Sequence, residues 1–189
     1  MRLGDSTTRW GPVSRALHWA MAGLILFQLG LGLWMTRRDD LLVRFAWTQV
    51  HKSWGTVVFG LALVRILWRL ANRARPGLPA DTPRWQARTA RATHALLYLG
   101  MVAMPLSGWV MASSSPTQDL LGIENLVFGR WPLPDPWVPG NAAVEFAAHA
   151  VHVAAAWSLA TVLALHAGAA LWHQLVRRDR VLVAMIRGA

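Results

Sequence analysis

The sequence has no cysteine, a single tyrosine and few acidic residues, and these shortages exclude several kinds of protein. Without cysteine, the chain forms no disulfide bond, holds no thiolate-ligated iron–sulfur cluster and attaches no haem covalently through a C-x-x-C-H motif. Asp and Glu number only nine and are absent from the long apolar segments described below, with Glu145 at the edge of one. Zinc and di-iron sites, which need carboxylates or thiolates, and Ser/His/Asp triads are therefore not expected in these segments.

Apolar residues and tryptophan are abundant in the chain. Hydrophobic residues make up 54% of it and charged residues only 15%, whereas a soluble domain carries about 25% charged residues. Twelve of the aromatic residues are tryptophan, whose indole suits the boundary between lipid tails and headgroups. The composition predicts an all-α integral membrane protein, and the length predicts a single transmembrane domain over residues 1–189.

Four segments are long and apolar enough to cross a bilayer as helices, which takes roughly 20 residues. They cover approximately residues 15–35, 47–70, 92–113 and 146–176. The connectors at 72–84 and 114–141 are rich in proline and are expected to be loops. The apolar fragment LLGIENLVFG in the second of them is too short to span. The first segment lacks a signal-peptide cleavage pattern, so it is expected to be retained. The predicted fold is a four-helix transmembrane bundle.

The basic residues predict the orientation of this bundle. Fourteen of the nineteen Lys and Arg residues lie at the chain ends and around the 72–84 connector: Arg2, Arg9, Arg15, Arg65, Arg69, Arg73, Arg75, Arg84, Arg88, Arg91, Arg177, Arg178, Arg180 and Arg187. The other five lie on the opposite side: Arg37, Arg38, Arg44, Lys52 and Arg130. The positive-inside rule therefore predicts a multi-pass protein of the bacterial inner membrane with both termini in the cytoplasm. Because the charges cluster beside the spans rather than along a soluble face, nucleic acid is not an expected partner.

All seven histidines fall within or at the ends of the four segments: His18, His51, His94, His149, His152, His166 and His173. Ionisable groups are costly inside a bilayer and are functional candidates by default. One such histidine could serve as a hydrogen-bonding group between helices. Seven in four helices require another explanation.

The histidine spacing predicts two metal sites stacked across the membrane. His152 and His166 are fourteen residues apart, so they share a helix face, about 40° apart around the axis and roughly 21 Å apart along it. Their depths pair His152 with His51 on the outer side and His166 with His18 on the inner side. Two neutral imidazoles on facing helices are a common way to hold haem in a bundle.

Arg65 lies fourteen residues after His51 and therefore shares its helix face at the depth of His166. A buried guanidinium needs an anion, and a haem propionate would supply one. Alternatively, Arg65 extends its side chain to the inner headgroups.

Four fragments, in one order along the chain, resemble the bacterial cytochrome b561 family: RALHW, VHKSWG, HALLYLGMVAMPLSGW and LHAGAALWH. The resemblance covers nearly the whole chain and includes the order and spacing of the histidines. It implies a four-helix membrane bundle that binds two haems b non-covalently, with His18, His51, His152 and His166 as the ligands of the haem iron.

The family resemblance also implies an activity. A characterised member oxidises superoxide on the periplasmic side and reduces ubiquinone, which implies an oxidoreductase of the electron-transport type. His173 matches a further family histidine seven residues beyond the inner ligand, and lies either at the quinone end or at headgroup level. On the outer side Arg44, Lys52 and Arg130 either attract the superoxide anion or anchor the protein in the membrane.

Several alternatives remain open. His149 is one turn from His152 but about 100° off the face of His166, so His152 is the preferred ligand. His94 could hydrogen-bond a propionate or a quinone, or replace His18. The chain could also be an electron-transfer subunit that accepts electrons from a periplasmic redox partner and passes them to the quinone pool. A haem-free protein whose histidines relay protons is a third hypothesis, and it predicts a colourless preparation.

Overall fold

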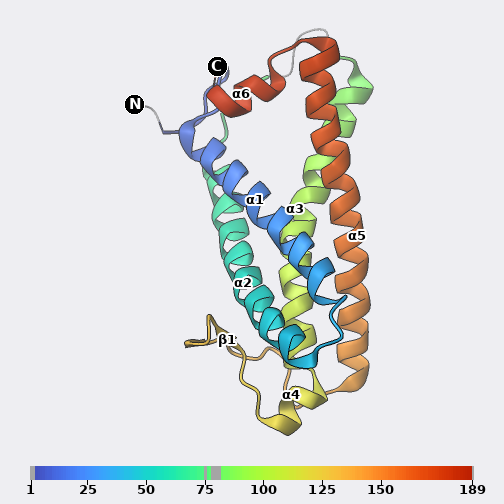
Figure 1. Ribbon diagram of the computed structural model, residues 1–189. Helices are drawn as coiled ribbons and strands as arrows, with labels where there is room; N and C mark the ends of the chain where they lie inside the picture. The colour runs from blue at the N-terminus through green and yellow to red at the C-terminus, as the bar shows by residue number, and fades with distance from the viewer. Residues whose placement is uncertain (1–2, 75, 78–81, 189) are drawn as a thin grey trace.

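Four long helices form the molecule, as the computed structural model shows for residues 3–74, 76–77 and 82–188 (Figure 1). They are α1 (Pro12–Met35), α2 (Leu41–Ala71), α3 (Arg84–Ser113) and α5 (Ala142–Trp172). Each is long and apolar enough to cross a membrane, the last together with the π-helical turn η1 (His173–Arg177) that continues it. The predicted all-α membrane fold with four spans is therefore confirmed. Arg2 and Arg75 of the charge pattern, like both ends of the proposed 1–189 domain, lie outside the described residues.

The helices begin earlier than the apolar segments predicted. Asp40 caps α2, and its carboxylate accepts hydrogen bonds of 2.9 and 3.0 Å from two backbone amides of the first turn. Asn141 caps α5 in the same way, with bonds of 3.0 and 3.2 Å. Such caps satisfy amides that have no partner inside the helix, so α2 and α5 begin ahead of their apolar stretches. The helices α2, α3 and α5 begin at Leu41, Arg84 and Ala142, before residues 47, 92 and 146, where the apolar segments begin.

The two ends of the bundle differ in structure (Figure 1). Both chain termini and the short helix α6 (Val181–Arg187) lie at one end, called here the terminal end. Two side chains of α1 attach α6 there: the Arg15 guanidinium donates to the Ile186 carbonyl at 2.7 Å, and the Trp19 indole to the Met185 carbonyl at 3.1 Å. The opposite, capped end carries residues 114–141, called here the cap.

The cap is a folded unit rather than the open loop expected from its prolines. It contains α4 (Pro116–Leu121) and an antiparallel hairpin of β1 (Leu126–Val127) and β2 (Trp131–Pro132). The hairpin turns at Phe128 and Gly129, which both have positive φ, 53° and 67°, as a type I′ turn requires. The Phe128 amide donates to the Ser53 hydroxyl of α2 at 2.8 Å, and its ring lies 5.5 Å from that of Trp54. These contacts attach the cap to the end of α2 beside His51.

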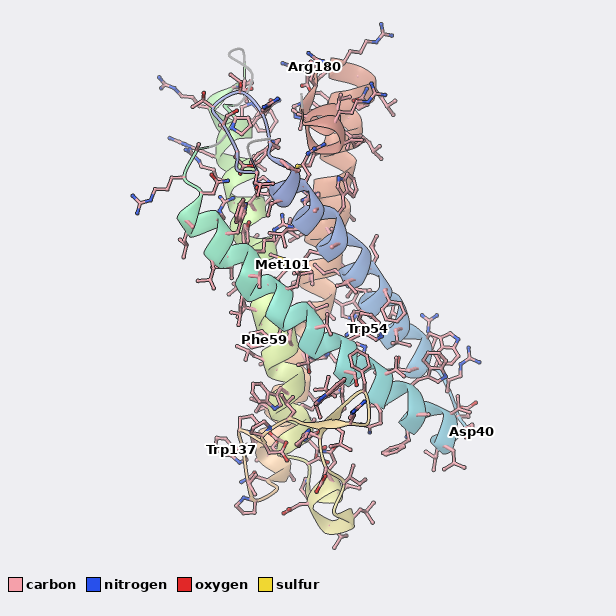
Figure 2. The ribbon with its side chains drawn as sticks, turned by 90° about the vertical axis from the view of Figure 1, so that its left-hand side faces the viewer. Asp40, Trp54, Phe59, Met101, Trp137 and Arg180 are labelled. Atoms are coloured by element: carbon pink, nitrogen blue, oxygen red, sulfur yellow. The ribbon has the colours of Figure 1, made fainter. Side chains whose placement is uncertain are left out.

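The core of the bundle is small, and most apolar side chains face outward. Its buried residues come from all four long helices: Met21, Ile25, Val58, Ala62, Met101 and Leu159. Figure 2 shows Met101 midway between the ends, with side chains projecting from every helix. Large hydrophobic residues are exposed along α1, α2, α3 and α5, as expected for helices whose outer faces contact lipid.

Candidate functional site

The structure brings His51 and His152 together near the capped end. His51 lies on α2 and His152 on α5, and their ring centres are 6.2 Å apart with the ring planes at 80°. Gly32 of α1 leaves room for His51, since a Cβ at that position would lie 3.6 Å from the imidazole Cε1. The His51 Nδ1 is buried and has no hydrogen-bond partner within the described chain. These are the two residues that helix depth paired on the outer side.

His18 and His166 form a second pair toward the terminal end. His18 lies on α1 and His166 on α5, with ring centres 6.1 Å apart and ring planes at 57°. Along α5, His152 and His166 are separated by roughly 21 Å, so the two pairs occupy different depths of one bundle.

Both pairs have the separation that a shared metal ion requires. A metal–imidazole bond is about 2.0 Å long, so two imidazoles on opposite sides of one metal ion have ring centres about 6 Å apart. The separations of 6.2 and 6.1 Å match this value. Together with the unpartnered Nδ1 of His51, this geometry fits bis-histidine ligation of haem.

Within the two pairs, His152 and His18 each have a hydrogen-bond partner at Nδ1, and the partners differ in kind. The Nδ1 of His152 lies 3.0 Å from the Met104 carbonyl and 3.1 Å from the Ser107 hydroxyl of α3. The Nδ1 of His18 instead lies 3.1 Å from a guanidinium nitrogen of Arg65. Because guanidinium only donates, the His18 Nδ1 is the acceptor of this bond.

Arg65 lies beside the His18/His166 pair, at the depth of His166 that the sequence predicted. It donates to the Leu17 carbonyl at 3.2 Å and to the Tyr98 hydroxyl at 3.4 Å, in addition to His18. Its side chain is half-buried and points into the bundle. In this conformation the Arg65 side chain contacts neighbouring helices and does not extend to the headgroups, which was the alternative. The single tyrosine, Tyr98, also packs against Arg69, with the guanidinium carbon 5.1 Å from the ring centre.

His94 is the third histidine of this region. Its ring centre lies 5.4 Å from that of His166, closer than the ring of His18. This distance is shorter than the value of about 6 Å for two imidazoles on opposite sides of one iron. His18 therefore fits the role of ligand better, and His94 is placed to contact groups at the edge of the site.

The remaining histidines lie apart from the two pairs. His149 is exposed and lines a small cavity of about 260 Å³ near the start of α5. His173 is half-buried at the start of η1, where its Nδ1 binds the carboxylate of Asp179 and its ring lies 5.2 Å from that of Trp172. Asp179 was not expected as a partner of His173 from the sequence. A carboxylate six residues after a histidine, among basic residues, could have indicated this contact.

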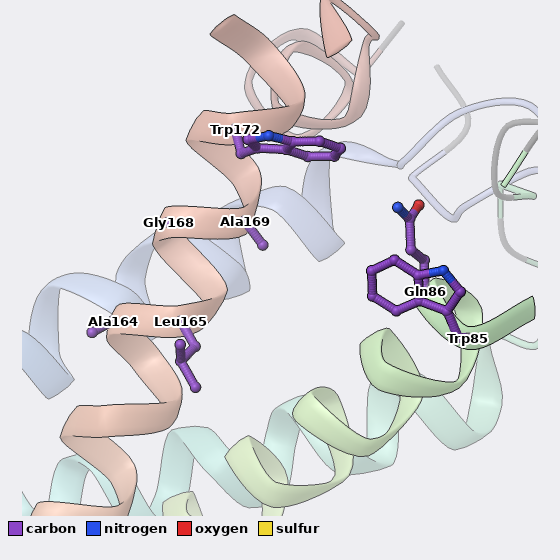
Figure 3. A pocket seen from close by; sticks show the side chains of 7 residues that line it. All are labelled: Trp85, Gln86, Ala164, Leu165, Gly168, Ala169 and Trp172. Atoms are coloured by element: carbon purple, nitrogen blue, oxygen red, sulfur yellow. The ribbon is translucent and has the colours of Figure 1, made fainter. Parts of the chain in front are cut away.

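A pocket of about 420 Å³ opens between the start of α3 and the end of α5 (Figure 3). Trp85 and Trp172 face it from the two helices, and the bare backbone of Gly168 leaves space in its wall. The Gln86 side chain also lines it, and its buried Oε1 has no hydrogen-bond partner within the described chain. The pocket lies on the stretch of α5 between His166 and His173.

A membrane helix bundle with paired interior histidines and no cysteine belongs to the class of membrane cytochromes that bind haem non-covalently. The family model for prokaryotic cytochrome b561 matches residues 9–188, so this chain belongs to the prokaryotic cytochrome b561 family. It is 30% identical over 190 residues to cytochrome b561 homolog 2 of Escherichia coli K12, covering 98% of this chain and 95% of that protein. It is also 30% identical over 172 residues to cytochrome b562 of Cereibacter sphaeroides, covering 90% of each chain.

Family membership agrees with the sequence-based identification and establishes the general role. The chain is a multi-pass membrane electron-transfer protein of a family that binds haem b.

Proposed function

We propose that this protein holds two haems b, one between His51 and His152 and one between His18 and His166, and carries electrons from periplasmic superoxide to ubiquinone. The observation that supports this most strongly is the pair of histidine couples at two depths, with ring centres 6.2 and 6.1 Å apart. The capped end would face the periplasm and the terminal end the cytoplasm of a bacterial inner membrane, as the distribution of basic residues favours.

The protein's own residues would bind and orient the cofactors. When bound, each haem supplies reversible one-electron storage at its iron. The four imidazoles would hold the irons, and Arg65 would provide a cation for a propionate at the His18/His166 site. The cap and the apolar helices would limit the access of water to the interior.

Basic residues at the capped end would attract the superoxide anion. Lys52 follows His51 directly and donates to the Gln118 side chain of the cap at 2.8 Å. Arg44 is exposed, and the guanidinium of Arg130 lies 5.5 Å from the ring centre of Trp131 on the hairpin. Positive charges around an entry point raise the local concentration of a small anion.

The pocket between α3 and α5 suits the head of a quinone. Its two tryptophans provide flat apolar walls, and its volume of about 420 Å³ lies in the range of small-molecule sites. His173 adjoins Trp172 and binds Asp179, so it could deliver a proton to a quinone oxygen. Overall, two superoxide ions would be oxidised to dioxygen while one quinone gains two electrons and two protons to become quinol.

Turnover by the purified chain tests this function. Proteoliposomes that contain only this protein and ubiquinone are supplied with superoxide, and quinol is measured. We expect quinol formation that superoxide dismutase abolishes and that a His152→Ala variant lacks. If the haem-loaded protein forms no quinol until a periplasmic redox protein is added, the superoxide assignment is wrong and the chain is an electron-transfer subunit.

A further inference from the structure

One turn of α3 lies in contact with the imidazole of His152. Three of its groups surround the ring: the Met104 carbonyl, the Ser107 hydroxyl and the bare Cα of Gly108. We call these three groups the α3 notch. Pro105 lies between them inside the helix, where it removes one backbone N–H donor from the ladder.

The hydrogen bonds of the notch determine which ring nitrogen of His152 carries the proton. The Met104 carbonyl can only accept, and it lies 3.0 Å from the His152 Nδ1, so Nδ1 carries the hydrogen. The Ser107 hydroxyl donates to the same carbonyl at 2.9 Å and presents its oxygen to Nδ1 at 3.1 Å. The Nε2 of His152 is therefore left with a free lone pair.

Gly108 supplies the space in which the ring lies. A Cβ at this position would be 3.1 Å from the Cε1 and 3.3 Å from the Nδ1 of His152. Both distances are below ordinary van der Waals contact, so any side chain here would displace the imidazole by a few tenths of an ångström. A small residue at this point and a hydroxyl one position earlier together fix the ring's position and its tautomer.

We propose that Ser107 and Gly108 are positioning residues that hold His152 in the orientation and tautomer needed to bind the iron of the outer haem. A metal-bound histidine normally donates its second N–H to an oxygen, which raises the basicity of the ligand and tunes the metal. The notch supplies this interaction at the His152 Nδ1. The inference rests on the proposed function, because it takes His152 to be a haem ligand.

Redox titration of the purified holoprotein, with low-spin EPR signals recorded in parallel, tests the notch. Ser107→Ala should keep both haems but shift the midpoint potential of one, because it removes the hydroxyl that contacts both the His152 Nδ1 and the Met104 carbonyl. Ser107→Thr should keep the wild-type potential, since it keeps the hydroxyl. Gly108→Ala should broaden or remove the low-spin signal of the same haem and lower the haem content from two per chain toward one. The second haem is an internal control for folding, because its signal should stay unchanged.

Two matched substitutions control for the chemical change itself. Ser113→Ala removes another buried hydroxyl of α3. This hydroxyl donates to the Val110 carbonyl at 3.2 Å and not to a histidine. Gly60→Ala adds a methyl group to α2 where nothing lies within 4 Å. Neither should change a potential or an EPR signal.

The outcomes distinguish this inference from the proposed function. If His152→Ala removes one haem while Ser107→Ala and Gly108→Ala leave both potentials and both signals unchanged, the notch has no positioning role. If His152→Ala retains two haems with unchanged spectra, the ligand assignment is itself wrong and the notch inference fails with it.

Discussion

Replacing Arg65 with leucine should loosen the haem of the inner site specifically. Arg65 donates to the His18 Nδ1 at 3.1 Å and to two oxygens, those of Leu17 and Tyr98. When His18 binds iron through Nε2, its proton must lie on Nδ1, so the guanidinium can no longer donate to it. A haem propionate then becomes the natural acceptor for the released donor.

The size of the effect follows from the bond that is lost. A hydrogen bond to a charged group contributes about 1.5–3 kcal/mol, and each 1.4 kcal/mol corresponds to about a tenfold change. Arg65→Leu should therefore release haem about 10- to 150-fold faster than the protein with Arg65. Arg65→Lys keeps the charge without the planar guanidinium, so its rate of haem release should lie between those of the protein with Arg65 and the Arg65→Leu variant.

The measurement is haem transfer to excess apomyoglobin from a protein that also carries His152→Ala, so that only the inner haem remains. Arg38→Leu serves as the control, because its guanidinium carbon lies 4.4 Å from the ring centre of Trp34 at the capped end, away from His18 and His166. A transfer rate for Arg65→Leu equal to that of its parent would refute the propionate role.

Three further substitutions test packing, anion attraction and the quinone pocket. Gly100→Ala would place a Cβ 2.9 Å from the Leu159 Cδ1 in the core, and such overpacking costs about 1–3 kcal/mol. Its thermal unfolding midpoint in detergent should fall, whereas that of Gly60→Ala should not, and equal midpoints would contradict the packing argument. Lys52→Gln should slow superoxide-dependent quinone reduction about 2- to 10-fold at low ionic strength and flatten its salt dependence, and an unchanged salt profile would assign Lys52 to anchoring. Gly168→Leu should fill the pocket and raise KM for ubiquinone about tenfold, or 1.4 kcal/mol, with an unchanged haem spectrum, and an unchanged KM would place the quinone elsewhere.

The sequence predicted the four spans because a bilayer imposes one strong requirement, a run of about 20 apolar residues. It predicted their starts less well, since hydropathy shows where lipid begins and not where backbone hydrogen bonding begins. The side chains of Asp40 and Asn141 accept hydrogen bonds from the first backbone amides of α2 and α5, where these helices begin. The cap hairpin was missed because its turn places Phe128 at positive φ, a conformation that side chains other than glycine rarely adopt.

The histidine pairs could be predicted because helix geometry relates spacing directly to face and depth. His152 and His166 share a face of α5 by arithmetic alone, and the structure places His51 and His18 opposite them. The contacts of Ser107 and Tyr98 could not be predicted in this way. They depend on how α3 is rotated and placed against its neighbours, and no repeating pattern in its sequence determines that.

The most direct test of the whole account is the haem content of purified protein in wild-type form and with His152→Ala or His18→Ala. It is measured as pyridine haemochrome per chain, together with the dithionite-reduced minus air-oxidised spectrum. We predict b-type bands with two haems per wild-type chain and one in each variant, with His149→Ala retaining both. A folded wild-type protein that binds no haem under ample haem supply, or variants that each keep two, would contradict the central claim.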